Sequence, residues 1–213
     1  MRKYSLFILS FILFFISACK QSDKLPIYGP REAVSKVDAS GKLVIDTIYK
    51  TIPEFTFLNQ DSIETSSKVM QNSIYVADFF FTNCSTICPI MHRNMKTLYD
   101  EYFNFEEVKF LSFTIDYKYD KPSVLKKYAQ KLGVDNNKWI FMYGPKAEVY
   151  NLAEKDYLVA VGEDDAEKDG YIHQGWLVLI DKESRIRGAY DGTDDEQVKK
   201  LKADIAILVN EYK

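Results

Sequence analysis

Apolar positions follow two different periods along this chain, and one period gives way to the other near residue 85. Residues 73–82, SIYVADFFFT, are rich in β-branched and aromatic side chains and lack glycine and proline, which is typical of a buried central strand. From residue 90 the apolar side chains fall close to the spacing of one helix face, at Ile90, Met91, Met95, Leu98 and Tyr102. The chain therefore passes from a strand to a helix between these two segments.

The same periods predict the other elements. We expect strands at residues 51–59, 108–116, 139–143, 172–181 and 185–190, and helices at residues 121–133, 146–158 and 193–213. Gly133 closes the first of these helices, and Thr193 or Asp194 caps the last. This alternation predicts an α/β fold of three layers with a mainly parallel central sheet, to which a late hairpin adds antiparallel strands.

Residues 1–18 have the form of a secretory signal peptide, with a basic start, an apolar stretch and small residues before Cys19. The apolar stretch is short for a membrane span. Its ending, ISAC, resembles the lipobox of bacterial lipoproteins, whose cysteine becomes the acylated first residue. We therefore expect lipidation at Cys19 and an extracytoplasmic protein anchored to the membrane on the periplasmic side. An ordinary signal peptide and an uncleaved anchor are the alternatives.

Composition separates a tether from a domain. Residues 19–45 are polar and contain prolines and glycines, so we expect them to connect the membrane to a domain at residues 46–213. With 46% hydrophobic and 15% aromatic residues, the chain has the composition of a globular protein with a sizeable core. Its formal charge of −3 provides no basic surface, so we expect no nucleic-acid partner.

Cys84 and Cys88 lie at the junction between the predicted strand and helix, and Pro89 suits the first turn of that helix. The N–H groups and the dipole of a helix start favour negative charge, so we expect a lowered thiol pKa here. One helical turn would place the two Cα atoms about 6 Å apart, which permits a disulfide or a shared metal ion. Outside the cytoplasm the two forms compete.

His173 follows a charged loop at residues 163–170, and its imidazole could complete a site with two thiolates. By itself, a histidine at a strand end is more often an ordinary hydrogen-bonded residue. Two thiolates and one imidazole suit Cu(I), and a water or a carboxylate would accommodate Cu(II). Zinc is possible with the same ligands and a water, although the affinity order favours copper.

Four further side chains are weaker candidates. His92 is an alternative ligand, but we expect a partly exposed helix residue, because it lies one turn beyond Cys88. Met91 and Met95 could bind Cu(I) and are expected in the core. Asp78 would be costly if buried without a partner, and we assign it no role.

Asp116 ends the strand expected beside the cysteine strand, and Asp120 lies four residues further on, where turn and cap chemistry is the ordinary role of aspartate. In such sheets, ligands bind at the carboxyl ends of the strands, which is the edge that the cysteines occupy. The position of the two carboxylates therefore leaves both roles open.

Three segments, in this order, resemble motifs of the SCO/SenC family of copper-binding assembly factors for cytochrome c oxidase. FFFTNCSTICPIM resembles FxxTxCPxxCPxxM, DYKYDKPSVLKKYAQKLG resembles DPxxDTPxxLxxYxxxFG, and YIHQGWLVLIDKESRI resembles VxHSxxxYLIDxxGxI. The resemblance implies a thioredoxin-like fold. It also implies the metal ligands Cys84, Cys88 and His173, with Asp116 and Asp120 in a second shell near the site.

The chain departs from these motifs at three positions and keeps every implied ligand. Ser85 stands in place of a proline between the cysteines, Tyr117 in place of a proline, and Gln174 in place of a serine. Thioredoxin oxidoreductases carry a cis-proline facing their cysteine pair, whereas this chain has no proline after Pro145. A metal ion could be admitted at that place.

The resemblance implies a lipid-anchored copper chaperone, in lipoprotein form, that delivers copper to a cytochrome c oxidase subunit or another copper protein. The alternative is an enzyme, a thiol-disulfide reductase that maintains the partner's cysteines without metal, with Cys84 and Cys88 as catalytic residues. A copper sensor or a domain with only a structural disulfide is a third class. We favour the chaperone because exchange chemistry alone has no need of His173.

Overall fold

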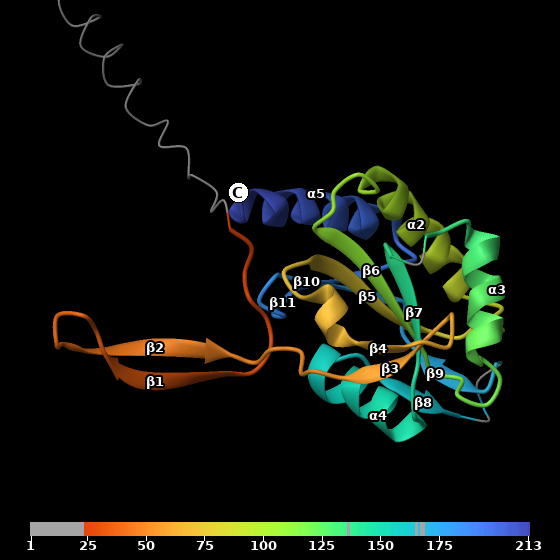
Figure 1. Ribbon diagram of the computed structural model, residues 1–213, viewed down its shortest axis with the longest axis horizontal. Helices are drawn as coiled ribbons and strands as arrows, with labels where there is room; N and C mark the ends of the chain where they lie inside the picture. Colours follow the sequence, from red (N-terminus) through yellow and green to blue (C-terminus); the bar gives the residue numbers. More distant parts are fainter. Residues whose placement is uncertain (1–23, 136, 165, 167–168) are drawn as a thin grey trace, which may run out of the picture.

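The computed structural model describes residues 24–135, 137–164, 166 and 169–213 (Figure 1). Its strands are β1 Arg31–Val37, β2 Leu43–Tyr49, β3 Thr56–Asn59, β4 Glu64–Ser66, β5 Ile74–Phe80, β6 Val108–Thr114, β7 Trp139–Tyr143, β8 Val161–Glu163, β9 Tyr171–His173, β10 Trp176–Ile180 and β11 Ile186–Asp191. The helices are α2 Cys88–Glu101, α3 Pro122–Leu132, α4 Lys146–Asn151 and α5 Asp195–Glu211, with a 3₁₀ turn η1 Ser67–Met70 and a π-helix η2 Leu152–Tyr157.

A seven-stranded sheet with the order β11-β10-β5-β6-β7-β3-β4 forms the centre of the molecule. The three middle strands, β5, β6 and β7, are parallel, and both edges are antiparallel. The thioredoxin-like three-layer fold is confirmed, and so is the late hairpin, β10 with β11. The second antiparallel edge, β3 with β4, was not expected, because β4 is only three residues long.

The two faces of the sheet are covered by different helices, as Figure 1 shows. On one face Asp78 and Phe80 of β5 contact His92 of α2, with a ring-centroid distance of 4.6 Å between Phe80 and His92. On the other face Phe79 contacts Tyr157 of η2 at 5.4 Å between ring centroids. Alternate side chains of one strand therefore enter two cores, as the two-residue period of a strand requires.

The strand predicted at residues 172–181 is divided into two strands that belong to different sheets. β9 pairs with β8 as a separate antiparallel hairpin, whereas β10 pairs with β5 and β11. Gly175 lies at the break, where its carbonyl oxygen accepts a hydrogen bond of 2.6 Å from the N–H of Gly192. A Cβ on Gly175 would lie 3.2 Å from a methyl group of Thr193, so the packing there is tight.

The segment expected to be a tether contains secondary structure. β1 and β2 pair along their whole length, from Arg31 with Tyr49 to Val37 with Leu43, and this hairpin projects from the body of the molecule (Figure 1). That this segment connects a membrane to the domain remains a prediction. Its conformation differs from an irregular tether, because it includes a β-hairpin. The predicted signal peptide and Cys19 lie outside the described residues. Within the described part of the chain, no helix is long and apolar enough to cross a bilayer.

Candidate metal centre

The cysteine loop, residues 81–88, joins the end of β5 to the start of α2 and carries both thiols. Cys84 and Cys88 are not joined in a disulfide, and both are buried. The backbone N–H of Cys88 donates a hydrogen bond to the sulfur of Cys84 at 3.3 Å. The sulfur of Cys84 also lies 3.6 Å from the hydroxyl of Thr86. The predicted junction is confirmed, with α2 beginning at Cys88 and Pro89 in its first turn.

The two sulfurs differ in their electrostatic surroundings. A hydrogen bond with Cys84 raises the pKa of the Cys88 thiol, and burial and the charge of Cys84 raise it further. The expectation that the helix start lowers the thiol pKa is therefore wrong for Cys88, because contact with the other sulfur and loss of solvent outweigh the dipole.

Asp120 fixes the beginning of the cysteine loop through hydrogen bonds with Thr82. Its fully buried carboxylate accepts a hydrogen bond of 2.8 Å from the N–H of Thr82, and others from the hydroxyls of Thr82 and Thr114. Burial raises the pKa of Asp120, although these hydrogen bonds oppose the shift. Asp120 therefore lies at the carboxyl ends of β5 and β6. Its partner Thr82 lies two residues before Cys84 in the sequence.

Asp116 has both a turn role and a contact with the strand of His173. One carboxylate oxygen accepts hydrogen bonds from the N–H groups of Lys118 at 3.1 Å and Tyr119 at 3.0 Å. The pKa of Tyr171 is raised, first by burial and then by a hydrogen bond to Asp116. Asp116 therefore connects the turn after β6 to β9, in addition to the turn chemistry that aspartate commonly provides.

His173 is the last residue of β9, and its backbone pairs with Val161 of β8. Its side chain lies outside the described part of the structure. The strand itself is attached to the cysteine loop, because the Tyr171 ring packs against Phe81 with 4.9 Å between centroids. Among the side chains that are described, no group of three or more His, Cys, Asp or Glu residues is arranged to hold a metal ion.

His92 is not the partly exposed residue that its position suggested, since only 1% of it is accessible to solvent. Its Nε2 lies 2.8 Å from Asp78 and its Nδ1 lies 2.8 Å from the hydroxyl of Tyr128, so both ring nitrogens have partners inside the protein. His92 therefore provides the buried carboxylate of Asp78 with a partner. Met91 and Met95 are fully buried, which confirms that they are core residues.

Sequence reasoning missed one contact of the cysteine loop. The carboxylate of Asp169, four residues before His173, accepts hydrogen bonds from the N–H of Ser85 at 2.9 Å and from its hydroxyl at 3.0 Å. Asp169 belongs to a run of acidic residues that was interpreted as a solvated loop. The missing proline at position 85 was the available signal, because only a residue with an N–H group can donate the first of these bonds.

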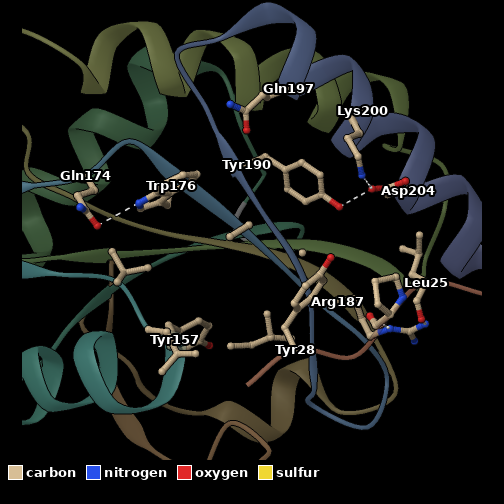
Figure 2. A pocket seen from close by; sticks show the side chains of 16 residues that line it. Leu25, Tyr28, Tyr157, Gln174, Trp176, Arg187, Tyr190, Gln197, Lys200 and Asp204 are labelled. Carbon is tan, nitrogen blue, oxygen red and sulfur yellow. Dashed lines mark hydrogen bonds and ion pairs between the residues drawn. The ribbon is translucent and has the colours of Figure 1, made fainter. Parts of the chain in front are cut away.

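A cavity of about 650 Å³ lies beside this region, between β11, η2 and α5 (Figure 2). Its lining is largely aromatic and aliphatic, and Gln174 and Trp176 form the side nearest to β9, with a hydrogen bond of 3.0 Å between them. At another side Tyr190 donates to Asp204 at 2.6 Å. Neither Cys84 nor Cys88 lines this cavity.

Several known proteins are similar to this chain over most of its length. A Bacillus subtilis protein described as a SCO1 protein homolog is 30% identical over 167 residues, which cover 78% of this chain and 86% of the relative. A SCO1/SenC family lipoprotein from Bacillus anthracis is 28% identical with a TM-score of 0.68, over 75% of this chain and 95% of that one.

Two further solved structures extend the comparison. BsSco, described with a disulfide switch and as a member of the Sco family of cytochrome c oxidase assembly proteins, is 30% identical with a TM-score of 0.65, over 74% of this chain and 92% of that one. ScoI of Arabidopsis thaliana with copper bound has a TM-score of 0.64 at 19% identity, over 76% and 100%, which shows the shared fold. The family model described as SCO1/SenC matches residues 46–210, so this chain belongs to the SCO1/SenC family.

Proposed function

We propose that this protein is an extracytoplasmic copper chaperone that binds copper through Cys84, Cys88 and His173. The observation that carries the proposal is the meeting of two segments that are distant in sequence. Two buried thiols in the loop before α2 lie beside β9, which carries His173, and the contacts of Tyr171 with Phe81 and of Asp169 with Ser85 join the two. A reduced thiol pair and one imidazole suit Cu(I).

Copper is the cargo of this protein, and transfer would occur by exchange of ligands. Loading displaces the thiol protons, so binding is expected to tighten as pH rises and to require the reduced pair. Descriptions of the similar proteins support the identity of the cargo and the receiver, since one is described with copper bound and another as a cytochrome c oxidase assembly protein. The receiver would be an oxidase subunit or another copper protein.

Attachment to a membrane is the second part of the proposal. Cys19 follows an apolar stretch in a lipobox-like ending, and the similar Bacillus anthracis protein is described as a lipoprotein. A lipid on Cys19 would hold the domain on the periplasmic side of a membrane, near a respiratory oxidase. Labelling of the wild type, but not of Cys19→Ala, with a radioactive fatty acid would support the anchor, and an unlabelled wild type would refute it.

The test of copper binding is an anaerobic titration of the reduced full chain with Cu(I) in competition with a chromophoric chelator. We expect Cys84→Ser and Cys88→Ser to abolish tight binding, and His173→Ala to weaken it by about tenfold or more. Gln174→Ala is the matched control, because Gln174 is exposed and adjacent to His173. Equal affinity in His173→Ala and the wild type would remove His173 from the site.

A thiol-disulfide reductase is the second candidate, because BsSco is described with a disulfide switch and the two thiols here differ in their surroundings. In that case one thiolate attacks a disulfide of the partner and the other resolves the mixed disulfide. Turnover would then survive His173→Ala and removal of copper, but not the loss of either cysteine. The chaperone requires the opposite dependence on His173.

A further inference from the structure

The cysteine loop has a second anchor on its solvent side, formed by Ser85 and Asp169. The carboxylate of Asp169 accepts the backbone N–H of Ser85 at 2.9 Å, while the Ser85 hydroxyl lies 3.0 and 3.1 Å from its two oxygens. Ser85 lies between the two cysteines in sequence, and Asp169 lies two residues before β9. These bonds therefore join the segment of the thiols to the segment of His173.

A second described contact also holds β9 near the cysteine loop. Tyr171 packs against Phe81 and hydrogen bonds to Asp116, which fixes the first residue of the strand. The partner strand β8 is held elsewhere, because Glu163 forms salt bridges with Lys118 and Lys146. Among the described contacts, the bonds of Asp169 reach the part of the loop between the cysteines.

The residue at position 85 decides whether this anchor can exist. A proline there, as in the motif that the cysteine segment resembles, has neither an N–H nor a hydroxyl and could donate none of the three bonds. Serine provides both donors from one residue, and a carboxylate can accept both at once. The anchor is thus a consequence of two residues of this chain, Ser85 and Asp169.

We propose that Asp169 is a positioning residue, which sets the distance of β9 from the thiols and thereby the contribution of His173 to copper binding. This inference rests on the proposed function. Hydrogen bonds to a charged acceptor are stronger than neutral ones, but Ser85 is exposed and water competes for the carboxylate. We therefore expect removal of the anchor to weaken Cu(I) affinity about fivefold, less than removal of His173 itself.

The central experiment is a double-mutant cycle with the reduced full chain and Cu(I) titrated anaerobically against a chelator. Asp169→Ala is expected to weaken affinity about fivefold in the wild-type background and to have no effect in the His173→Ala background. Ser85→Pro should act like Asp169→Ala, whereas Ser85→Thr, which keeps both donors, should restore wild-type affinity. Asp164→Asn is the charge control in the same loop, because its amide oxygen can still accept the N–H of Ala166.

A measurement without copper separates this inference from the proposed function. Amide hydrogen exchange of β9 should be faster in Asp169→Ala than in the wild type, with the unfolding free energy of the domain unchanged. Equal exchange in the two proteins overturns the inference, and so does an affinity loss that persists in the His173→Ala background. If the cysteine variants bind Cu(I) as the wild type does, the proposed function fails and the inference fails with it.

Discussion

His92→Leu is expected to be the most informative single change for stability, because it breaks a buried polar network beneath the cysteine helix. His92 joins Asp78 of β5 to Tyr128 of α3 through its two ring nitrogens, each at 2.8 Å. Asp78 also accepts a hydrogen bond from Ser112, whose hydroxyl oxygen accepts the indole N–H of Trp139 at 2.8 Å. The network thus connects α2 and α3 to three neighbouring strands.

The magnitude follows from the burial of Asp78, which has no exposed surface. With leucine at position 92, the Asp78 carboxylate would keep Ser112 as its hydrogen-bond partner among the contacts described above. Removing one member of a buried pair costs about 3–5 kcal/mol, and the unpartnered Tyr128 hydroxyl adds about 1–3 kcal/mol. Burial of the leucine side chain returns about 2 kcal/mol, so we expect a net loss near 4 kcal/mol.

The assay is urea unfolding of the reduced protein, with Arg93→Leu as the control on the exposed side of the same helix. The control is expected to change the unfolding free energy by less than about 0.5 kcal/mol. Asp78→Leu combined with His92→Leu removes both partners, and should cost at least about 2 kcal/mol less than the sum of the single changes. A loss below about 1 kcal/mol in His92→Leu, or strict additivity in the double variant, would refute the account of the network.

Three further predictions concern stability. Burial raises the pKa of Asp120 above its ordinary 3.8, so this carboxyl contributes stability that is lost as pH rises through the raised pKa. Asp120→Asn should therefore reduce the decrease of the unfolding free energy with pH, measured from about pH 4 upward, and an unchanged slope would contradict this. Gly192→Ala should cost about 1–3 kcal/mol in urea unfolding, because its Cβ would lie 2.7 Å from Met91, whereas Gly162→Ala, with ordinary contacts of 3.7 Å, should be tolerated. Arg187→Met should cost about 3–5 kcal/mol, because the buried guanidinium contacts two carboxylates and the carbonyls of Leu25 and Pro26. A protease should then cut the N-terminal segment faster, and resistance equal to that of the wild type would be the contrary result.

The elements that sequence patterns predicted best are those whose surroundings are uniform. The buried strand β5 and the strand at Trp139–Tyr143 follow directly from runs of mainly apolar residues, because every side chain there except Tyr143 is buried. The apolar run of residues 172–181 gave one strand where the structure has two. Its break at Gly175 arises from the close approach of Gly192, a tertiary contact that leaves no periodic signal.

At the site, the spacing of the cysteines and a proline predicted the junction, whereas burial and partners could not be predicted. His92 was expected at the surface because helix geometry alone carries it away from the loop. Its burial depends on Asp78, fourteen positions earlier on the strand, and on Tyr128 of another helix. In the same way Asp169 looked like one more charge in an acidic loop, since its partner Ser85 is far away in sequence.

The two sides of the cysteine loop differ in how firmly they are held, and under the proposed function this difference predicts an order of copper-ligand exchange. The bonds of Asp120 to Thr82 are buried, where loss of a partner is costly and salt does not reach. The bonds of Asp169 to Ser85 are partly exposed, so water and salt weaken them. The strand of His173 should therefore separate from the loop before the loop leaves the sheet. Under the proposed function, a receiving protein would therefore be expected to displace His173 before the two thiols.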